Sequence, residues 1–195
     1  MMHASVCIVM CKAPELGKVK TRLAAEVGNA QALRVYEALL RITLQASTSS
    51  TWETVLAVDG DHSCMPQHPH RTVGQRGNEL GVRICNAIND VGVYDRIVVI
   101  GADAPRVTHR HIADAFHALD THDVVLGPAT DGGYWLIGMQ QLHPDLFADI
   151  PWSTDSVLTR TRERCQQHAR TVALLETLSD IDVRADLEQL MPDTM

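Results

Sequence analysis

Four cationic side chains stand within eleven residues near the start of the chain and could bind phosphate groups. They are Lys12, Lys18, Lys20 and Arg22, and they directly follow an apolar stretch. A clamp for a diphosphate or triphosphate is favoured over a solvated basic loop, because the chain as a whole carries a net charge of −7. The stretch is not a Walker A motif, in which Ser or Thr would replace Val19 and Gly would replace Lys12. The chain also lacks a G-x-G-x-x-G dinucleotide motif.

A carboxylate follows the most apolar stretch of the chain, R-I-V-V-I-G-A-D-A-P at residues 96–105. Ile97–Ile100 shows no polar alternation, which predicts a strand buried on both faces by helices. Gly101 would let the backbone turn, and Pro105 cannot continue a strand ladder. Asp103 is therefore expected at the carboxyl end of a central strand. It either caps the following turn or binds Mg²⁺ or Mn²⁺ together with phosphate oxygens.

A second carboxylate stands in D-G-G-Y-W at residues 131–135. Asp131 and Gly132 form the Asp-Gly pair that is typical of a tight hairpin turn. The two glycines would also allow a ligand to approach the backbone closely. Beside the cationic stretch and Asp103, a turn that faces the substrate is favoured, with Asp131, Gly132, Gly133 and Tyr134 as substrate contacts.

Two further features are candidates for the same site. Asp180 and Asp182 alternate, so both carboxylates would point to one side, where they either join a metal site or cap the last helix. Trp152 is most often a packing anchor in such a position, although tryptophan also stacks on sugars and bases.

The elements that must position these side chains alternate between strand and helix. Such an order indicates right-handed crossovers and a parallel sheet. The two strands at 123–128 and 134–139 are too close for a crossover helix, so some antiparallel pairing is expected. One mixed α/β domain over residues 1–195 follows. Strands are expected at Ser5–Met10, Thr54–Val58, Ile97–Ile100, Asp123–Pro128, Tyr134–Met139 and Thr171–Leu175, helices at Asn29–Ala46, Asn78–Val91, after Thr108, at Asp155–His168 and Ala185–Leu190, and irregular chain at Cys11–Arg22 and Asp59–Thr72.

The composition excludes several classes of protein. Hydrophobic residues make up 45% and charged residues 21%, as in ordinary globular domains. The acidic balance argues against a nucleic-acid partner, and no stretch is apolar enough for a membrane span. The five cysteines are odd in number and form no C-x-x-C pair, which suits a reducing cytosol. We expect a cytoplasmic protein.

Five motifs occur in order along the chain and together resemble a known family. The motifs are K-A-P-E-L-G-K-V-K-T-R-L (12–23), G-A-D-A-P (101–105), G-P-A-T-D-G-G-Y-W-L-I-G (127–138), I-P-W-S-T (150–154) and S-D-I-D-V-R-A-D-L (179–187). With them the chain resembles small bacterial transferases labelled as arsenosugar-biosynthesis-type glycosyltransferases. That family is similar to nucleotide-diphospho-sugar transferases of the GT-A fold, and more distantly to phospholactate and molybdenum-cofactor guanylyltransferases. The resemblance implies a three-layer α/β/α sandwich around a mixed, mostly parallel sheet.

The resemblance also implies roles for residues. Asp103 matches the aspartate that binds Mg²⁺ or Mn²⁺. The chain departs from the family at Ala104, where Cys is common, and at Asn78-Glu79, where a pair containing Asp is usual. It also lacks a G-G-x-S-x-R-M loop, which weakens the case for nucleotidyl transfer. The residues expected to bind the nucleotide and its phosphates are Lys12, Pro14, Gly17, Lys18, Lys20, Arg22, Gln75 and Arg83.

These expectations together describe a metal-dependent glycosyltransferase that moves a sugar from a nucleotide-diphospho-sugar to a small-molecule acceptor. Lys20 and Arg22 would stabilise the diphosphate leaving group, and Asp131 would deprotonate the acceptor hydroxyl. A nucleotidyltransferase that acts on an NTP and a phosphorylated small molecule is the alternative enzyme. A non-catalytic nucleotide-binding protein is the alternative outside enzymes.

Overall fold

The computed structural model describes residues 4–191. Seven strands form one sheet in the order β3-β2-β1-β4-β6-β5-β7. Only β6 runs antiparallel, paired with β4 on one side and β5 on the other. The predicted mixed, mostly parallel sheet is thereby confirmed, and so is the antiparallel pair at 123–139. The strands are β1 (Ser5–Lys12), β2 (Glu53–Asp59), β3 (Arg71–Gly74), β4 (Arg96–Gly101), β5 (Val124–Pro128), β6 (Tyr134–Met139) and β7 (Val172–Leu174).

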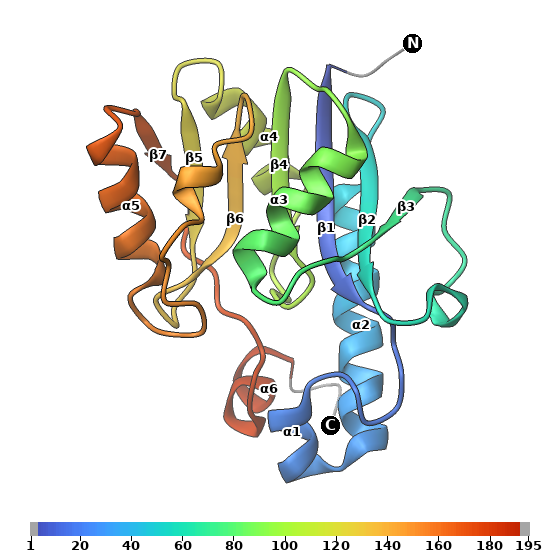
Figure 1. Ribbon diagram of the computed structural model, residues 1–195. Coiled ribbons are helices and arrows are strands. Elements are labelled where there is room, and N and C mark those ends of the chain that lie inside the picture. Colours follow the sequence, from blue (N-terminus) through green and yellow to red (C-terminus); the bar gives the residue numbers. More distant parts are fainter. Residues whose placement is uncertain (1–3, 192–195) are drawn as a thin grey trace.

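Helices cover both faces of the sheet, as the three-layer prediction requires (Figure 1). One face packs on α2 and α4, through residues such as Tyr36, Leu40 and Phe116. The other face packs on α3 and α5, through residues such as Ile84 and Cys165. The helices are α1 (Thr21–Val27), α2 (Asn29–Ser47), α3 (Leu80–Val91), α4 (His109–Ala118), α5 (Val157–Gln167) and α6 (Arg184–Leu190), with short 3₁₀ turns at His62–Cys64 and Pro144–Leu146.

The central strands are apolar on both faces because both faces are covered. Val9 of β1 lies between Leu56 of β2 and Ile100 of β4, and each of the three is no more than 1% exposed. Such strands must read as unbroken apolar runs. The same spacing logic explains α2, whose buried residues recur at intervals of three and four along its length.

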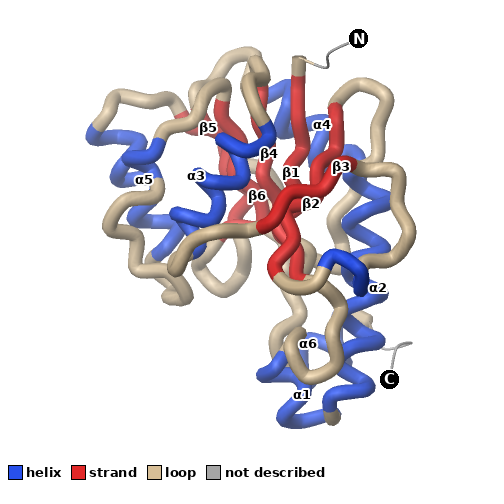
Figure 2. The backbone as a smooth tube through the Cα atoms, turned by 45° about the vertical axis from the view of Figure 1, so that its right-hand side comes forward, coloured by secondary structure: helices blue, strands red, loops and turns tan. Residues whose placement is uncertain are grey.

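A small lobe lies below the sheet in Figures 1 and 2, and consists of α1, α6 and the nearby end of α2. Its own core contains Leu23 of α1, Val35 and Leu39 of α2, and Leu187 of α6, all of them fully buried. The lobe thus packs α1 against α6, two helices that are far apart in the sequence. Helix α2 is shared between the lobe and the sandwich, which fixes their relative position.

Two expectations about elements were wrong. Residues 11–22 are not all irregular, because β1 continues to Lys12 and α1 begins at Thr21. The stretch Asp59–Thr72 is mostly irregular, as expected, apart from a 3₁₀ turn and the start of β3. Finally, Gly101 is not in the left-handed region, so the turn after β4 does not depend on glycine there.

The carboxyl ends of the parallel strands lie at one edge of the sheet, where open α/β sheets bind ligands. Lys12 at the end of β1 pairs with Asp59 at the end of β2. Asp103 follows β4 at the same edge. Because β6 is antiparallel, its beginning at Tyr134 and the preceding turn also lie there. Among the described residues, no helix is long and apolar enough to cross a membrane.

Candidate active site

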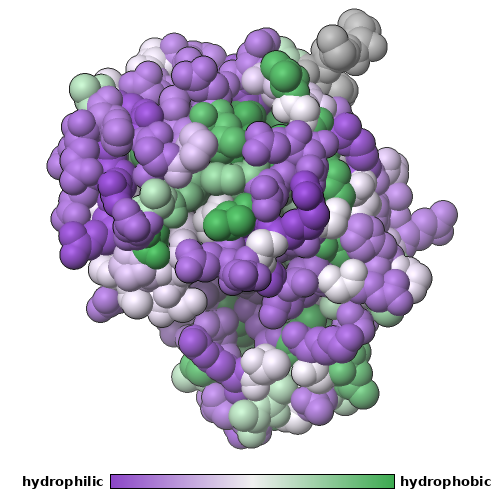
Figure 3. All heavy atoms as spheres, in the orientation of Figure 1, coloured by the Kyte–Doolittle hydropathy of each residue, from purple (hydrophilic) through white to green (hydrophobic). Residues whose placement is uncertain are grey.

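A cavity of about 490 Å³ opens at this edge, between the sheet and the small lobe. Figure 3 shows hydrophilic side chains around the hollow that separates the two parts. Four of the predicted phosphate-binding cations line the cavity: Lys12, Lys20, Arg22 and Arg83. They come from β1, α1 and α3, so residues far apart in sequence converge. We call this the cationic cavity.

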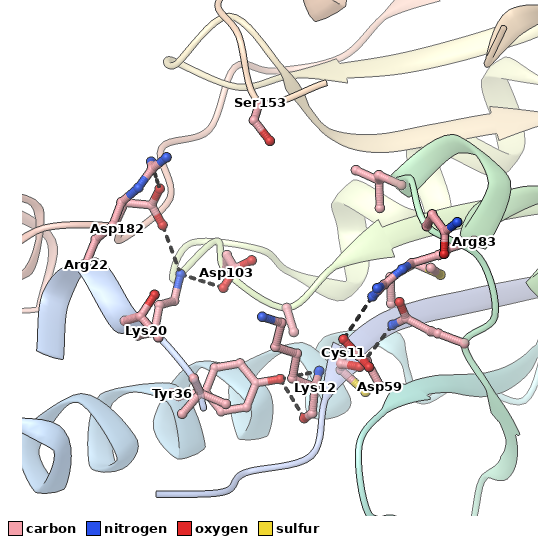
Figure 4. A pocket seen from close by; sticks show the side chains of 17 residues that line it. Cys11, Lys12, Lys20, Arg22, Tyr36, Asp59, Arg83, Asp103, Ser153 and Asp182 are labelled. Carbon is pink, nitrogen blue, oxygen red and sulfur yellow. Dashed lines mark hydrogen bonds and ion pairs between the residues drawn. The ribbon is translucent and has the colours of Figure 1, made fainter. Parts of the chain in front are cut away.

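Lys20 is the most enclosed of these cations, with only 6% of its side chain exposed. Its ammonium lies 2.5 Å from Asp103 Oδ1 and 3.4 Å from Asp182 Oδ1. Arg22 Nη1 approaches the other oxygen of Asp182 at 3.2 Å. Figure 4 shows Lys20 pointing at both carboxylates. Asp103 therefore reaches across to Lys20 and not back to its own turn.

The opposite wall is held by a second ion pair. Arg83 Nη1 donates to Asp59 Oδ2 at 2.8 Å, while Arg83 Nε donates to the Gly77 carbonyl at 2.9 Å. The amide of Gln75 donates to the carbonyls of Cys11 and Ala57 at 3.0 and 2.8 Å. Both contacts fix the amide nitrogen against the ends of β1 and β2, and Gln75 also lines the cavity.

Three other members of the cationic stretch lie outside this cavity. Lys18 pairs with Glu15 Oε2 at 2.6 Å on the surface. Pro14 lines a separate groove beside α2. Gly17 has a left-handed φ of 78°, which glycine adopts without steric cost, and it therefore shapes the loop. None of the three appears among the residues that line the cationic cavity.

A second cavity of about 390 Å³ adjoins the first. Four carboxylates line it, and no Lys or Arg is among its described lining residues. The two cavities share Met10, Leu80, Asp103, Ser153 and Asp182. We call this one the carboxylate cavity. Its carboxylates are Asp103, Asp131, Asp180 and Asp182.

Asp131 both shapes its turn and lines the carboxylate cavity. Its Oδ1 accepts the Gly133 N–H at 2.9 Å, and the carboxylate is exposed. Gly132 has φ 88°, and a Cβ there would lie 2.1 Å from the Asp155 carbonyl oxygen. Only glycine fits so close to that backbone. The tight-turn interpretation of the D-G-G-Y sequence is therefore confirmed, and contact of this turn with a substrate stays a prediction.

Asp180 and Asp182 line the carboxylate cavity and do not cap the last helix. Asp186 does that, by accepting the backbone N–H groups of Asp182 and Val183 at 2.9 Å each. Burial raises the pKa of the Asp180 carboxyl above its usual range, and the nearby carboxylates of Asp131 and Asp182 raise it further. The Ile181 N–H donates to the Asp103 carbonyl at 3.3 Å, which ties this segment to the turn after β4.

Aromatic rings form the far wall of the carboxylate cavity. Trp152 meets Tyr134 edge to face, with ring centroids 6.4 Å apart. The Trp152 indole N–H and the Tyr134 hydroxyl are buried without a hydrogen-bond partner in the described part of the chain. Burial also raises the pKa of Tyr134, which stays a neutral phenol. Trp152 is thus a packing residue that also faces the cavity.

Sequence reasoning missed several lining residues: Tyr36, Asp59, Asn78 and Ser153. Asp59 could have been found, because it follows a buried strand just as Asp103 does. Tyr36 could not, since it stands in the middle of α2. Its hydroxyl donates to the Lys12 carbonyl at 2.8 Å and accepts the Lys12 N–H at 2.7 Å, which holds the end of β1 in place.

Comparison with known proteins was made by family, by sequence and by structure. The family described as "Uncharacterized protein conserved in bacteria (DUF2064)" matches residues 40–154. No curated protein sequence matches the chain. A crystal structure from Desulfovibrio desulfuricans G20, provisionally named a nucleotide-diphospho-sugar transferase, is 30% identical. It aligns over 97% of this chain and 92% of its own, with a TM-score of 0.85.

Two more distant structures share the fold. Rv0371c from Mycobacterium tuberculosis, in complex with manganese, is 16% identical with a TM-score of 0.57, over 96% of this chain and 98% of its own. A CMP:2-keto-3-deoxy-manno-octonic acid synthetase complexed with CTP is 12% identical with a TM-score of 0.59, over 98% of this chain and 99% of its own. The fold is therefore that of nucleotide-diphospho-sugar transferases and nucleotidyltransferases.

Proposed function

The chain belongs to the bacterial DUF2064 family, and we propose that it is a glycosyltransferase that uses a nucleotide-diphospho-sugar and a small-molecule acceptor. One observation carries the proposal: a cationic cavity and a carboxylate cavity meet at Asp103. A nucleotide-diphospho-sugar has the same two parts, an anionic diphosphate and a neutral sugar rich in hydroxyls. The relative named as a nucleotide-diphospho-sugar transferase supports this choice.

The cationic cavity suits the nucleotide diphosphate. Lys12, Lys20, Arg22 and Arg83 supply ammonium and guanidinium donors, which form charge-assisted hydrogen bonds to phosphate. In glycosyl transfer, negative charge grows on the departing diphosphate as the sugar–oxygen bond breaks. Fixed cations placed there stabilise that charge more in the transition state than in the ground state. We assign this role to Lys20 and Arg22.

The carboxylate cavity suits the sugar and the acceptor. Carboxylate oxygens accept hydrogen bonds from hydroxyl groups, and the rings of Tyr134 and Trp152 provide an apolar wall. Asp131 has an oxygen left over after its bond to Gly133, and it can take the proton of the acceptor hydroxyl as general base. Gly132 and Gly133 have no side chains that could block a ligand from approaching Asp131.

The residues present fit a Mg²⁺ or Mn²⁺ ion. Among the described residues no group of three His, Cys, Asp or Glu side chains could hold a metal. Asp103 and Asp182 nevertheless converge on one point, now taken by the Lys20 ammonium. Mg²⁺ is commonly held by one or two carboxylates, substrate phosphates and water. When bound there, the ion would neutralise charge on the diphosphate.

Nucleotidyl transfer is the second candidate, because the fold is shared with the CTP-bound synthetase. In that reaction a phosphorylated acceptor would attack the α-phosphate of an NTP. The carboxylate cavity opposes this, since its described lining residues include no Lys or Arg, and Asp131 and Asp180 would repel a phosphate. A binding protein without catalysis is the remaining alternative.

The experiment that separates these functions is identification of the released product. The protein is incubated with a panel of nucleotide-diphospho-sugars and of NTPs, with Mn²⁺ or Mg²⁺, and its melting temperature is followed in parallel. Release of NDP above the uncatalysed rate supports the glycosyltransferase, whereas pyrophosphate from an NTP supports nucleotidyl transfer. A melting shift without either product supports a binding protein; ligand at ~100 times its Kd adds about 2.7 kcal/mol of stability. If no nucleotide shifts the protein or reacts, the proposal fails.

A further inference from the structure

We propose that Lys20 occupies the cation position of the site until nucleotide phosphates draw its ammonium away, so that metal and nucleotide binding are coupled. The inference rests on the proposed function only in assuming that phosphates enter the cationic cavity. Its subject is the ammonium of Lys20 and the two carboxylates that hold it (Figure 4).

The contacts of Lys20 are those of a bound cation. Its Nζ bridges Asp103 Oδ1 at 2.5 Å and Asp182 Oδ1 at 3.4 Å. These two carboxylates come from the turn after β4 and from the segment before α6, and no other described cation approaches Asp103. A divalent ion on Asp103 would require the same oxygen. Two cations at contact distance repel one another, so the Lys20 ammonium and a metal ion compete for this oxygen.

The backbone holds Lys20 in this place. Lys20 has φ 47° and ψ 48°, a left-handed conformation that costs a residue with a side chain free energy. The conformation stands immediately before α1, whose Leu23 is buried in the core of the small lobe. The packing of α1 therefore fixes the direction of the Lys20 side chain, which points into the cavity and is only 6% exposed.

Entering phosphates offer Lys20 a better set of partners. The ammonium lines the cationic cavity beside Lys12 and Arg22, so a diphosphate bound by those two would lie within reach of it. When Lys20 turns to the phosphate, Asp103 Oδ1 becomes free to bind a metal ion. Metal affinity is then low in the free protein and rises with nucleotide, and linkage requires the reverse effect to be equal.

Mn²⁺ titration without nucleotide tests this directly, with free Mn²⁺ measured by electron paramagnetic resonance. In Lys20→Met the ammonium is gone, and we expect Mn²⁺ to bind about tenfold more tightly than in the wild-type protein, a typical coupling between sites. Lys18→Met is the matched control. It removes the same charge from the same loop, but its ammonium pairs with Glu15 outside the cavity. Its Mn²⁺ affinity should stay within about twofold of wild type.

If Lys20→Met fails to fold, a second variant can be tested in its place. Lys20→Gly removes the ammonium and suits the left-handed backbone. In either background, Asp103→Asn should abolish the gain. Equal or weaker Mn²⁺ binding without Lys20, or an equal gain in Lys18→Met, would overturn the inference. Since no turnover is measured, these outcomes leave the proposed transfer reaction to be judged by its own product assay.

Discussion

The two cavities share five lining residues and yet differ in charge. The cationic cavity is built mainly by the first half of the chain, with Lys12, Lys20, Arg22 and Arg83 set against Asp59, Asp103 and Asp182. The carboxylate cavity relies more on the second half, with four carboxylates and no Lys or Arg among its described residues. A uniform pocket would bind one kind of group. A pocket divided in this way suits the molecule that we propose, which has one anionic end and one neutral, hydroxyl-rich end.

The difference in charge also predicts different roles for the two cavities. Affinity for the nucleotide should come from the cationic cavity, and the chemistry on the transferred group from the carboxylate cavity. Each variant below changes a residue of one cavity, or Asp103 where the two cavities meet, and so tests whether the cavities have separate roles.

The largest effect is expected at the junction. Asp103 lines both cavities and is the predicted metal ligand. Asp103→Asn should lower turnover by about 10²–10³-fold, the scale of losing one electrostatic group at a reacting centre. It should also remove the dependence of nucleotide-induced melting shifts on Mn²⁺. A metal-dependent shift that persists in this variant would place the metal elsewhere.

The next effect is on stability and concerns the turn of the carboxylate cavity. A Cβ on Gly132 would lie 2.1 Å from the Asp155 carbonyl oxygen, at a φ of 88°. Gly132→Ala should cost about 3 kcal/mol in free energy of unfolding. Gly101→Ala is the control at the same edge, because its Cβ meets nothing within 4 Å and its φ is ordinary. Urea denaturation compares them, and equal losses would show that the close approach is not what requires glycine.

A smaller effect is expected from the general base. Asp131→Asn keeps the size of the side chain and an oxygen for the Gly133 N–H, but it cannot take a proton. We expect kcat to fall about 10²-fold, while the Kd of the donor stays unchanged because the cationic cavity is intact. Steady-state kinetics and donor titration measure both. An unchanged kcat would show that Asp131 is not the base. A higher Kd for the donor would show that the carboxylate cavity also contributes to donor affinity.

The smallest effect is a pH dependence of stability from Asp180. Its pKa is raised in the folded protein by burial and by Asp131 and Asp182, and Lys20 opposes this only in part. The folded state therefore binds the proton more tightly than the unfolded state, and stability falls as pH rises through this range. Asp180→Asn removes the penalty.

The Asp180→Asn protein should consequently have a higher melting temperature than the wild-type protein at pH 7, because the substitution removes a carboxylate whose charge is disfavoured by burial and by its neighbours. Its advantage should shrink as the pH is lowered below the pKa of Asp180. Melting curves from pH 4 to pH 8 would show this. An advantage independent of pH would point to packing and not to charge.

Much of the fold could be predicted from local patterns. Unbroken apolar runs such as Ile97–Ile100 predicted the buried strands, and spacing along 29–46 predicted α2 almost to its ends. The two missed elements lacked such patterns. Helix α1 is short and contributes Leu23 as its only buried residue, and β3 is a four-residue edge strand with no fully buried residue. Both exist because neighbouring elements support them.

The site was predicted less completely, since sequence shows which groups exist but not where they point. Lys18 and Lys20 are two residues apart, yet one lies on the surface with Glu15 and the other is buried between carboxylates. The left-handed backbone at Lys20 causes this, and nothing in the local sequence marks it. Asp59 was overlooked although it ends a buried strand, because no motif drew attention to it.

The sequence by itself determined the class of fold, the edge of the sheet at which we propose that ligands bind and the kinds of charge found there, because apolar periodicity and strand-end residues are local properties. Only the tertiary structure decided which charges meet. Lys20 and Asp182 are 162 positions apart and touch because α1 and α6 pack in one lobe. Asp103 joins them because β4 lies next to β1 in the sheet. Such convergence depends on strand order and lobe packing, which no single stretch of sequence contains.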